Sequence, residues 1–257
     1  MHPYFIFPLG TDWTISIPAY SFFACIGLLC MMLFLYFRTQ AAGIPYLRYL
    51  LLIGYMVAGV GIGSKALFVV TQIPKWLENP TIQNLAHIIW TSGFVFYGGL
   101  LGAIAGSAIF AKQFQIPFQM LANLVAPGFP LFHFWGRIGC FFAGCCYGKP
   151  AVWGIAMVED LSTPRIPIQL IEAVCISTIF VILLLAERNR PTISLLKLYL
   201  GLYAVCRFLL EFYRGDTLRG FLLGLSTSQW VSLVILRYLI ISALHKKEKP
   251  TAKPQPE

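Results

Sequence analysis

Seven long apolar stretches run through this chain, and they constrain its fold more than any other feature. They cover approximately Ile17–Phe37, Tyr49–Val70, Ile88–Ala111, Phe118–Trp135, Ile168–Ala186, Leu195–Tyr213 and Leu222–Leu244. A helix needs about 20 apolar residues to cross a bilayer, and an open sheet cannot cross because its edge groups would stay unpaired in lipid. Only 11% of the residues are charged, whereas soluble proteins reach about 25%. The sequence therefore predicts an all-α membrane protein with about seven transmembrane helices, and it excludes a soluble globule and a disordered chain.

The domain organisation and the orientation follow from the same stretches. We expect residues 1–245 to form a single polytopic membrane domain. Residues 246–257 are charged and rich in proline, so we expect a disordered cytoplasmic tail there. If the N-terminus is placed outside, lysine and arginine are more numerous in the cytoplasmic loops than in the outer ones. This bias predicts an outside N-terminus and a cytoplasmic C-terminus.

A net charge of +9 is large for a chain that lies mostly in lipid. Part of it belongs to the C-terminal segment, and the rest comes from arginines near the outer side. Ionisable groups within spans are costly and usually face a partner or a cavity, and Glu172 is one of them. Arg207, Glu211 and Arg214 are spaced by four and three residues, which predicts one shared helical face. They form either a snorkelling salt bridge at a helix end or part of a binding site.

Another arginine lies in a glycine-rich segment, GRIGCFFAGCCYGKP, that begins at the end of the fourth stretch. Its glycines allow sharp turns and a close approach of the backbone to a ligand. Arg137 together with exposed backbone N–H groups would make a good anion receptor. The anion available at membrane depth is a lipid phosphate. We therefore expect Arg137 and Arg207 to bind a phospholipid head group in the outer leaflet.

A second glycine-rich segment, FYGGLLGAIAG, opens the third apolar stretch. Gly98, Gly102 and Gly106 recur every four residues, which is the pattern of a helix-packing face made of small residues. Packing alone would explain this pattern. Tyr97, just ahead of it, is either an interfacial aromatic residue or a member of the site.

The glycine-rich segment around Arg137 resembles the signature segment of the prolipoprotein diacylglyceryl transferase family. Five other segments occur in the family's order: PAYSFF (Pro18–Phe23), FYGGLLG (Phe96–Gly102), NLVAPGFPL (Asn123–Leu131), RIPIQLIEA (Arg165–Ala173) and RFLLEFYRGD (Arg207–Asp216). LSTSQW (Leu225–Trp230) resembles the family's late Ser-x-Gln stretch. The resemblance implies seven helices and a multi-pass enzyme of the bacterial cytoplasmic (inner) membrane. Its reaction would move the diacylglyceryl group of phosphatidylglycerol to the thiol of a lipobox cysteine, with release of glycerol-1-phosphate.

The resemblance also implies roles for single residues. Arg137 and Arg207 match the family's two essential arginines, and Glu211 matches the acid that follows the second one. We expect a catalytic group made of Arg137, Arg207, Glu211, Tyr97 and His133. We expect a substrate-binding group made of Tyr20, Gly98, Gly99, Gly148, Cys140 and Cys145.

At four positions the chain departs from the family's usual residues. Cys140 replaces an asparagine, Cys145 a glutamate, Asn123 an aspartate, and Tyr97 the histidine of a His-Gly-Gly motif. Tyr97 could orient the head group, but a phenol is a poor base at neutral pH. His133, four residues before Arg137, is either the base or an ordinary hydrogen-bonded histidine in a span.

Three neighbouring cysteines, Cys140, Cys145 and Cys146, leave several interpretations open. The three side chains simply pack in the protein interior, or Cys140 forms a disulfide with Cys145 or Cys146. In the third interpretation, a thiolate near Arg137 acts as a nucleophile. A structural or redox role is favoured. The spacing indicates zinc only weakly because a structural site needs four ligands. We therefore expect no metal and no cofactor.

The expected partners are phosphatidylglycerol, a prolipoprotein signal peptide with its lipobox cysteine, and membrane lipids, with no nucleic acid. Two alternatives to the transferase function stay open. One is a paralogue that uses phosphatidylglycerol with a different acceptor, and the other is a non-catalytic lipid-binding membrane protein.

Overall fold

The computed structural model describes residues 3–8, 14–90, 95–157, 160–190, 192–215, 221–222 and 224–248. Most of these residues are helical. The helices are α1 (Ala19–Ala41), α2 (Tyr46–Leu77), α3 (Ile82–Trp90), α4 (Phe96–Gln113), α5 (Phe118–Val125), α6 (Gly128–Ala143), α7 (Ile168–Asn189), α8 (Leu195–Glu211) and α9 (Thr227–Glu248). The chain divides into two compact units, Met1–Met31 with Ala126–Glu257 and Met32–Val125, which are described separately.

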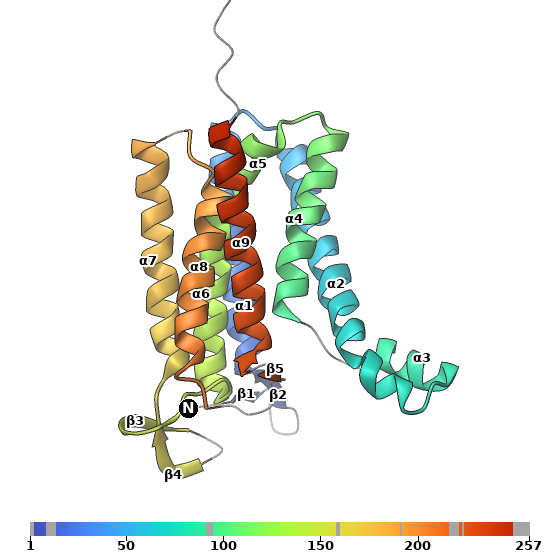
Figure 1. The fold of residues 1–257 in the computed structure, drawn as a ribbon, viewed down its shortest axis with the longest axis vertical. Helices are drawn as coiled ribbons and strands as arrows, with labels where there is room; N and C mark the ends of the chain where they lie inside the picture. The colour runs from blue at the N-terminus through green and yellow to red at the C-terminus, as the bar shows by residue number, and fades with distance from the viewer. Residues whose placement is uncertain are drawn as a thin grey trace, which may run out of the picture. The chain divides into compact units, whose positions relative to one another are not determined.

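In the first unit, helices α6, α7, α8 and α9 run side by side, each packed on the next (Figure 1). Successive helices alternate in direction. The C-terminal ends of α6 and α8 therefore lie at the same end of the bundle as the N-terminal ends of α7 and α9 (Figure 1). The beginning of α1 packs closely on α6, because a Cβ atom at Gly139 would lie 3.2 Å from the Tyr20 Cα.

Short antiparallel hairpins lie at this end of the bundle. They pair β1 (Tyr4–Pro8) with β2 (Thr14–Pro18), β3 (Pro150–Met157) with β4 (Asp160–Arg165), and β5 (Phe221–Leu222) with β6 (Leu225–Ser226). Backbone hydrogen bonds also join the segments that leave α6, β4 and α8. The Gly148 N–H donates to the Ile166 carbonyl at 2.9 Å, and the Lys149 N–H donates to the Tyr213 carbonyl at 2.9 Å. These three connections are therefore tied together independently of their side chains.

In the second unit, α2 packs against α4 through glycines (Figure 1). A Cβ atom at Gly102 would lie 1.9 Å from the Gly59 carbonyl oxygen, and one at Gly98 would lie 2.3 Å from the Gly63 carbonyl oxygen. A Cβ at Gly106 would also collide with α2, 2.2 Å from the Tyr55 carbonyl oxygen. The three glycines at four-residue spacing therefore form a helix-packing face, as the sequence predicts.

Among the described residues, four helices are long and apolar enough to cross a membrane: Ala19–Ala41, Tyr46–Ile73, Ile168–Asn189 and Thr227–Leu244. These four coincide with the first, second, fifth and seventh predicted stretches. The chain is thus mostly helical with membrane-length apolar helices. The last helix begins at Thr227 because Leu222 lies in a hairpin, and the first begins at Ala19 because Ile17 and Pro18 lie in β2.

Two of the predicted stretches are not continuous helices. The stretch Ile88–Ala111 is divided between α3 and α4, since Val95 adopts an extended conformation just before α4. The stretch Phe118–Trp135 is divided between α5 and α6. Pro127 has no N–H to continue the hydrogen bonding of α5, and it precedes the first residue of α6.

The C-terminal boundary also differs from the expectation. Helix α9 continues to Glu248, so residues 246–248 are helical and do not begin a tail at 246. The expected tail from 249 to 257 lies outside the described residues, as does Asp216, the last residue of the RFLLEFYRGD segment.

Candidate functional site

A buried carboxylate, Glu172 near the start of α7, lies at the centre of a polar cluster inside the helix bundle. The Arg137 Nη2 atom is 3.0 Å from its Oε1, and the Arg207 Nη1 atom is 3.6 Å from its Oε2. The Tyr203 hydroxyl donates a hydrogen bond to Oε1 at 2.9 Å, and the His133 Nε2 atom lies 3.9 Å from the same oxygen. Glu172 thus brings together the two arginines that the sequence predicts to act as a pair.

The second carboxylate of the site, Glu211, is the last residue of α8. Its Oε2 atom is 2.6 Å from the Arg207 Nη2 and 4.0 Å from the Arg214 Nε. Arg207 also donates a hydrogen bond to the Ser228 hydroxyl, at the start of α9, at 3.2 Å. The three charged side chains therefore interact as their spacing predicts, and Ser228 fixes Arg207 from a second helix.

The charge balance of the cluster favours an anionic ligand. Three guanidiniums (Arg137, Arg207 and Arg214) face two carboxylates, which leaves one positive charge. The Arg137 Nε is buried and forms no hydrogen bond with any described residue, and the Arg207 Nη1 has only the 3.6 Å ion pair with Glu172. A buried donor without a hydrogen bond is costly, and an anion that accepts from it removes that cost.

His133, in the middle of α6, is held by two tyrosines of α8. Its Nδ1 atom lies 3.4 Å from the Tyr199 hydroxyl oxygen, and its ring meets the Tyr203 ring edge-on at a centroid distance of 4.7 Å. The side chain is only 4% exposed. Both Glu172, whose Oε1 is 3.9 Å from Nε2, and Arg137 act on the ring, so the structure places His133 beside the ion pair of these two residues.

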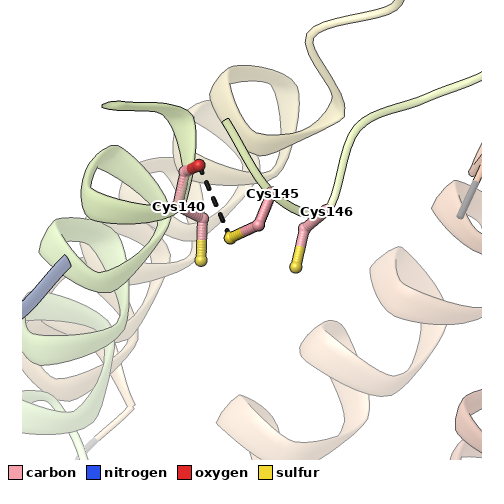
Figure 2. A group of neighbouring side chains, drawn as sticks. All are labelled: Cys140, Cys145 and Cys146. Carbon is pink, nitrogen blue, oxygen red and sulfur yellow. Dashed lines mark hydrogen bonds between the residues drawn. The ribbon is translucent and has the colours of Figure 1, made fainter. Parts of the chain in front are cut away.

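Cys140 lies in the last turn of α6, and Cys145 and Cys146 lie in the turn that follows. The three sulfur atoms lie within 4.8 Å of one another, and all three residues are free cysteines (Figure 2). The Cys145 thiol donates a hydrogen bond to the Cys140 carbonyl at 3.6 Å (Figure 2). Hydrogen bonding with the Cys140 and Cys145 thiols lowers the pKa of Cys146 against the effect of its burial, and the charges of Arg214 and Arg137 lower it further. Tyr20, at the start of α1, is close enough to interact electrostatically with the same thiols and with Arg137.

Gly148 is in the network of backbone hydrogen bonds at the end of the bundle. It pairs with Arg214 in an isolated antiparallel bridge. A Cβ atom at Gly148 would lie 2.6 Å from the Ile166 Cβ and 2.7 Å from its carbonyl oxygen. Position 148 therefore has no room for a side chain. The bridge between Gly148 and Arg214 also holds the backbone of Arg214 in place.

The remaining predicted site residues lie in the second unit. Tyr97, Gly98 and Gly99 form the first turn of α4, where Tyr97 is half-buried and the two glycines are buried. Gly99 faces Ser64, whose hydroxyl oxygen would lie 2.6 Å from a Cβ added there. Their neighbours within this unit belong to α2, so these glycines take part in the contact between α2 and α4.

The central role of Glu172 was not predicted from the sequence, nor were the contacts of Tyr203 and Ser228. A signal for two of them is present. Glu172 is an acid within an otherwise apolar stretch, and Tyr203 precedes Arg207 by one helical turn. Their convergence could not be read from the sequence because α6, α7 and α8 contribute the groups from distant positions.

A buried group of arginines and glutamates among apolar, membrane-length helices is typical of a membrane protein with a candidate polar site inside its helix bundle. Comparison with known proteins specifies it further. The family model described as prolipoprotein diacylglyceryl transferase matches residues 8–244. Similar proteins include the phosphatidylglycerol–prolipoprotein diacylglyceryl transferase 2 of Clostridium perfringens, 30% identical over 89% of this chain and 90% of the relative.

Two more relatives carry the name phosphatidylglycerol–prolipoprotein diacylglyceryl transferase. The protein of Clostridium tetani is 32% identical over 85% of this chain and 89% of the relative. The protein of Polynucleobacter asymbioticus is 36% identical over 77% of this chain and 78% of the relative. The chain therefore belongs to the prolipoprotein diacylglyceryl transferase family, as its motifs predict, and it is accordingly a transferase.

Proposed function

We propose that this chain transfers the diacylglyceryl group of phosphatidylglycerol to the thiol of a lipobox cysteine in a prolipoprotein and releases glycerol-1-phosphate. The observation that carries this proposal is the buried cluster in which Arg137 and Arg207 share Glu172. Its excess of one positive charge matches the single negative charge of a phosphodiester. The names of the relatives supply the identity of the lipid and of the acceptor.

The reaction exchanges one bond for another. The acceptor sulfur forms a bond to the terminal glycerol carbon of the diacylglyceryl group, and the bond from that carbon to the phosphate oxygen breaks. The electron pair leaves with glycerol phosphate, which gains a second negative charge. Arg137 and Arg207 stabilise this charge, because fixed positive groups act most strongly where charge develops in a site with little water. The same positive field favours the acceptor thiolate, whose proton passes to water before the attack.

The other predicted residues receive supporting roles. Glu172 and Glu211 hold the guanidiniums in place, and His133 positions Glu172. For Tyr97, whose hydroxyl would orient the head group, the role rests on the family resemblance. The same holds for the substrate-binding residues: Tyr20, Gly148, Cys140 and Cys145 in the first unit, and Gly98 and Gly99 in the second.

The membrane arrangement proposed for this function has seven transmembrane helices in a single polytopic domain. Helices α4, α6 and α8 complete the set begun by the four membrane-length helices. The N-terminus lies outside and the C-terminus in the cytoplasm, in the bacterial inner membrane. The excess of lysine and arginine in the cytoplasmic loops supports this orientation, and it brings the polar cluster to the outer leaflet.

The test uses the purified full-length protein in detergent with phosphatidylglycerol labelled in its acyl chains and a lipobox peptide. Label on the peptide cysteine supports the proposal. Release of glycerol phosphate without peptide labelling would indicate a different acceptor, and lipid binding without turnover would indicate a lipid-binding protein.

The arginine clamp is tested with Arg137→Lys and Arg207→Lys, which keep the charge but lose the planar fork. We expect each to lower kcat by about 100-fold, the size of losing one charge-stabilising donor. The matched control is Arg188→Lys, in the last turn of α7 and exposed. Equal rates for the three variants would refute the clamp.

A further inference from the structure

The three cysteines at the end of α6 carry thiols that take no part in the bonds exchanged by the proposed transferase reaction. Figure 2 shows Cys140, Cys145 and Cys146 with their sulfur atoms directed into the same space. Every pair of sulfurs lies within 4.8 Å. Three sulfurs around one Zn²⁺ or Cu⁺ ion, at metal–sulfur bonds of about 2.3 Å, would stand about 4 Å apart. The separation already present is therefore close to that of a three-thiolate metal site.

The backbone holds the group in this arrangement. Gly144 ends α6 in the left-handed conformation with φ 76°, and Cys146 adopts φ 62°, which few residues other than glycine do. Adjacent residues in extended chain point to opposite sides, but this turn directs Cys145 and Cys146 to the same side (Figure 2). The Cys145 N–H bonds to the Cys140 carbonyl at 3.1 Å, and Gln169 donates to the Cys145 carbonyl at 2.6 Å. The thiols are thus preorganised.

We propose that Cys140, Cys145 and Cys146 form a binding site for one soft, thiophilic metal ion of the Cu⁺ or Zn²⁺ class. Thiolate ligands select these ions over harder ones such as Mg²⁺ or Ca²⁺. Binding breaks three S–H bonds, forms three S–metal bonds and releases three protons to solvent. The resulting complex is an anion, with charge −2 for Cu⁺ and −1 for Zn²⁺.

The surroundings suit such an anionic complex. The charges of Arg137 and Arg214 act on the Cys146 thiol. The cluster of three guanidiniums and two carboxylates has one excess positive charge, which offsets part of the negative charge of a metal thiolate complex. The three thiols are the group of His, Cys, Asp and Glu ligands that the described residues bring together. Three thiolates suffice for a trigonal Cu⁺ ion, whereas Zn²⁺ would need a fourth ligand such as water. The proposal concerns binding alone and does not depend on the transferase reaction.

The experiment measures metal binding to the reduced, full-length protein in detergent under nitrogen. Cu⁺ is titrated in competition with bicinchoninic acid, and Zn²⁺ is titrated separately against a chromogenic chelator. We expect one equivalent of at least one of the two ions, with an ultraviolet sulfur-to-metal charge-transfer band for Cu⁺. Failure of both ions to reach one equivalent would overturn the proposal.

Variants locate the site. Cys140→Ser, Cys145→Ser and Cys146→Asn each remove one ligand, and asparagine tolerates the positive φ of Cys146. We expect each to weaken binding by about 100-fold, since loss of even an outer partner weakens metal sites 10- to 100-fold. The controls Cys25→Ser and Cys175→Ser keep the wild-type affinity. Equal affinity in all five variants would place the metal elsewhere and refute the site.

Protection of the wild-type thiols from alkylation by bound metal provides a second test, which does not depend on the folding of any variant. Alkylation of the wild-type protein with iodoacetamide, mapped by mass spectrometry, should slow at least tenfold at Cys145 and Cys146 when metal is bound. The exposed Cys25 should react at the same rate with and without metal. Unchanged alkylation of Cys145 and Cys146 at one equivalent of metal would contradict the proposal.

Discussion

Replacing Glu172 by glutamine should destabilise the protein while strengthening its response to an anionic lipid. Glu172 is fully buried and is the partner of both Arg137 and Arg207. Removing one member of a buried ion pair costs about 3–5 kcal/mol, because the remaining charge stays buried without compensation. Arg207 keeps Glu211 and Ser228 as partners. We therefore expect the lower end of this range, about 3 kcal/mol.

The assay is thermal unfolding in detergent, followed by tryptophan fluorescence. At about 2–4 °C per kcal/mol for a protein of this size, the unfolding temperature should fall by about 6–12 °C. The control is Glu187→Gln on the same helix, away from the cluster, for which we expect a change within about 0.5 kcal/mol. Without Glu172, the cluster carries two excess positive charges. Phosphatidylglycerol should therefore raise the unfolding temperature of Glu172→Gln more than that of the wild type.

Two results would refute this reasoning. Equal unfolding temperatures for Glu172→Gln and Glu187→Gln would mean that the arginines do not depend on the carboxylate. An equal or smaller stabilisation of Glu172→Gln by phosphatidylglycerol would mean that the lipid phosphate does not bind at this cluster. A neutral lipid, such as diacylglycerol, controls for a general effect of lipid on the helices.

Three further predictions concern packing and the role of a histidine. Gly148→Ala should lower the unfolding temperature and the transferase rate, since overpacking costs about 1–3 kcal/mol. The control Gly136→Ala, where a Cβ atom meets open space, should change neither. Equal stability of the two variants would contradict the packing argument. Gly102→Val should destabilise the protein in the same unfolding assay, and Gly54→Val, in open space on α2, should have a smaller effect. His133→Gln should lower kcat without moving the pH profile of kcat. Loss of the acidic limb, where a general base is protonated and inactive, would identify His133 as the base instead.

The sequence predicted the features that follow from local spacing and missed the way in which distant helices bring the site together. The spacing of Arg207, Glu211 and Arg214 was sufficient to predict their interaction, because three and four residues make one helical turn. The glycines around Gly102 predicted a close helix contact for the same reason. The meeting of Arg137 and Arg207 at Glu172 depends on how three helices pack, and no local spacing contains that information.

The helix breaks and the thiol cluster show a second limit. Pro127 divides the stretch Phe118–Trp135, although hydrophobicity alone runs through it without a gap. The three cysteines left several alternatives open because their directions depend on the backbone angles of Gly144 and Cys146. Composition cannot supply a positive φ at a cysteine, where that conformation is uncommon.

The backbone bonds that join the loops at the end of the bundle bear on how this site can change during evolution. The N–H groups of Gly148, Lys149 and Gly215 and their carbonyl partners hold the segments that adjoin α6, α7 and α8 through main-chain atoms alone. Side chains nearby can therefore be exchanged without displacing the arginines. The main-chain hydrogen bonds hold the backbone in place whichever side chains surround it. Cysteines could therefore replace the usual polar residues at positions 140 and 145 while the charged cluster kept its geometry. A one-residue insertion between Gly144 and Gly148 would be far less tolerable than any substitution there.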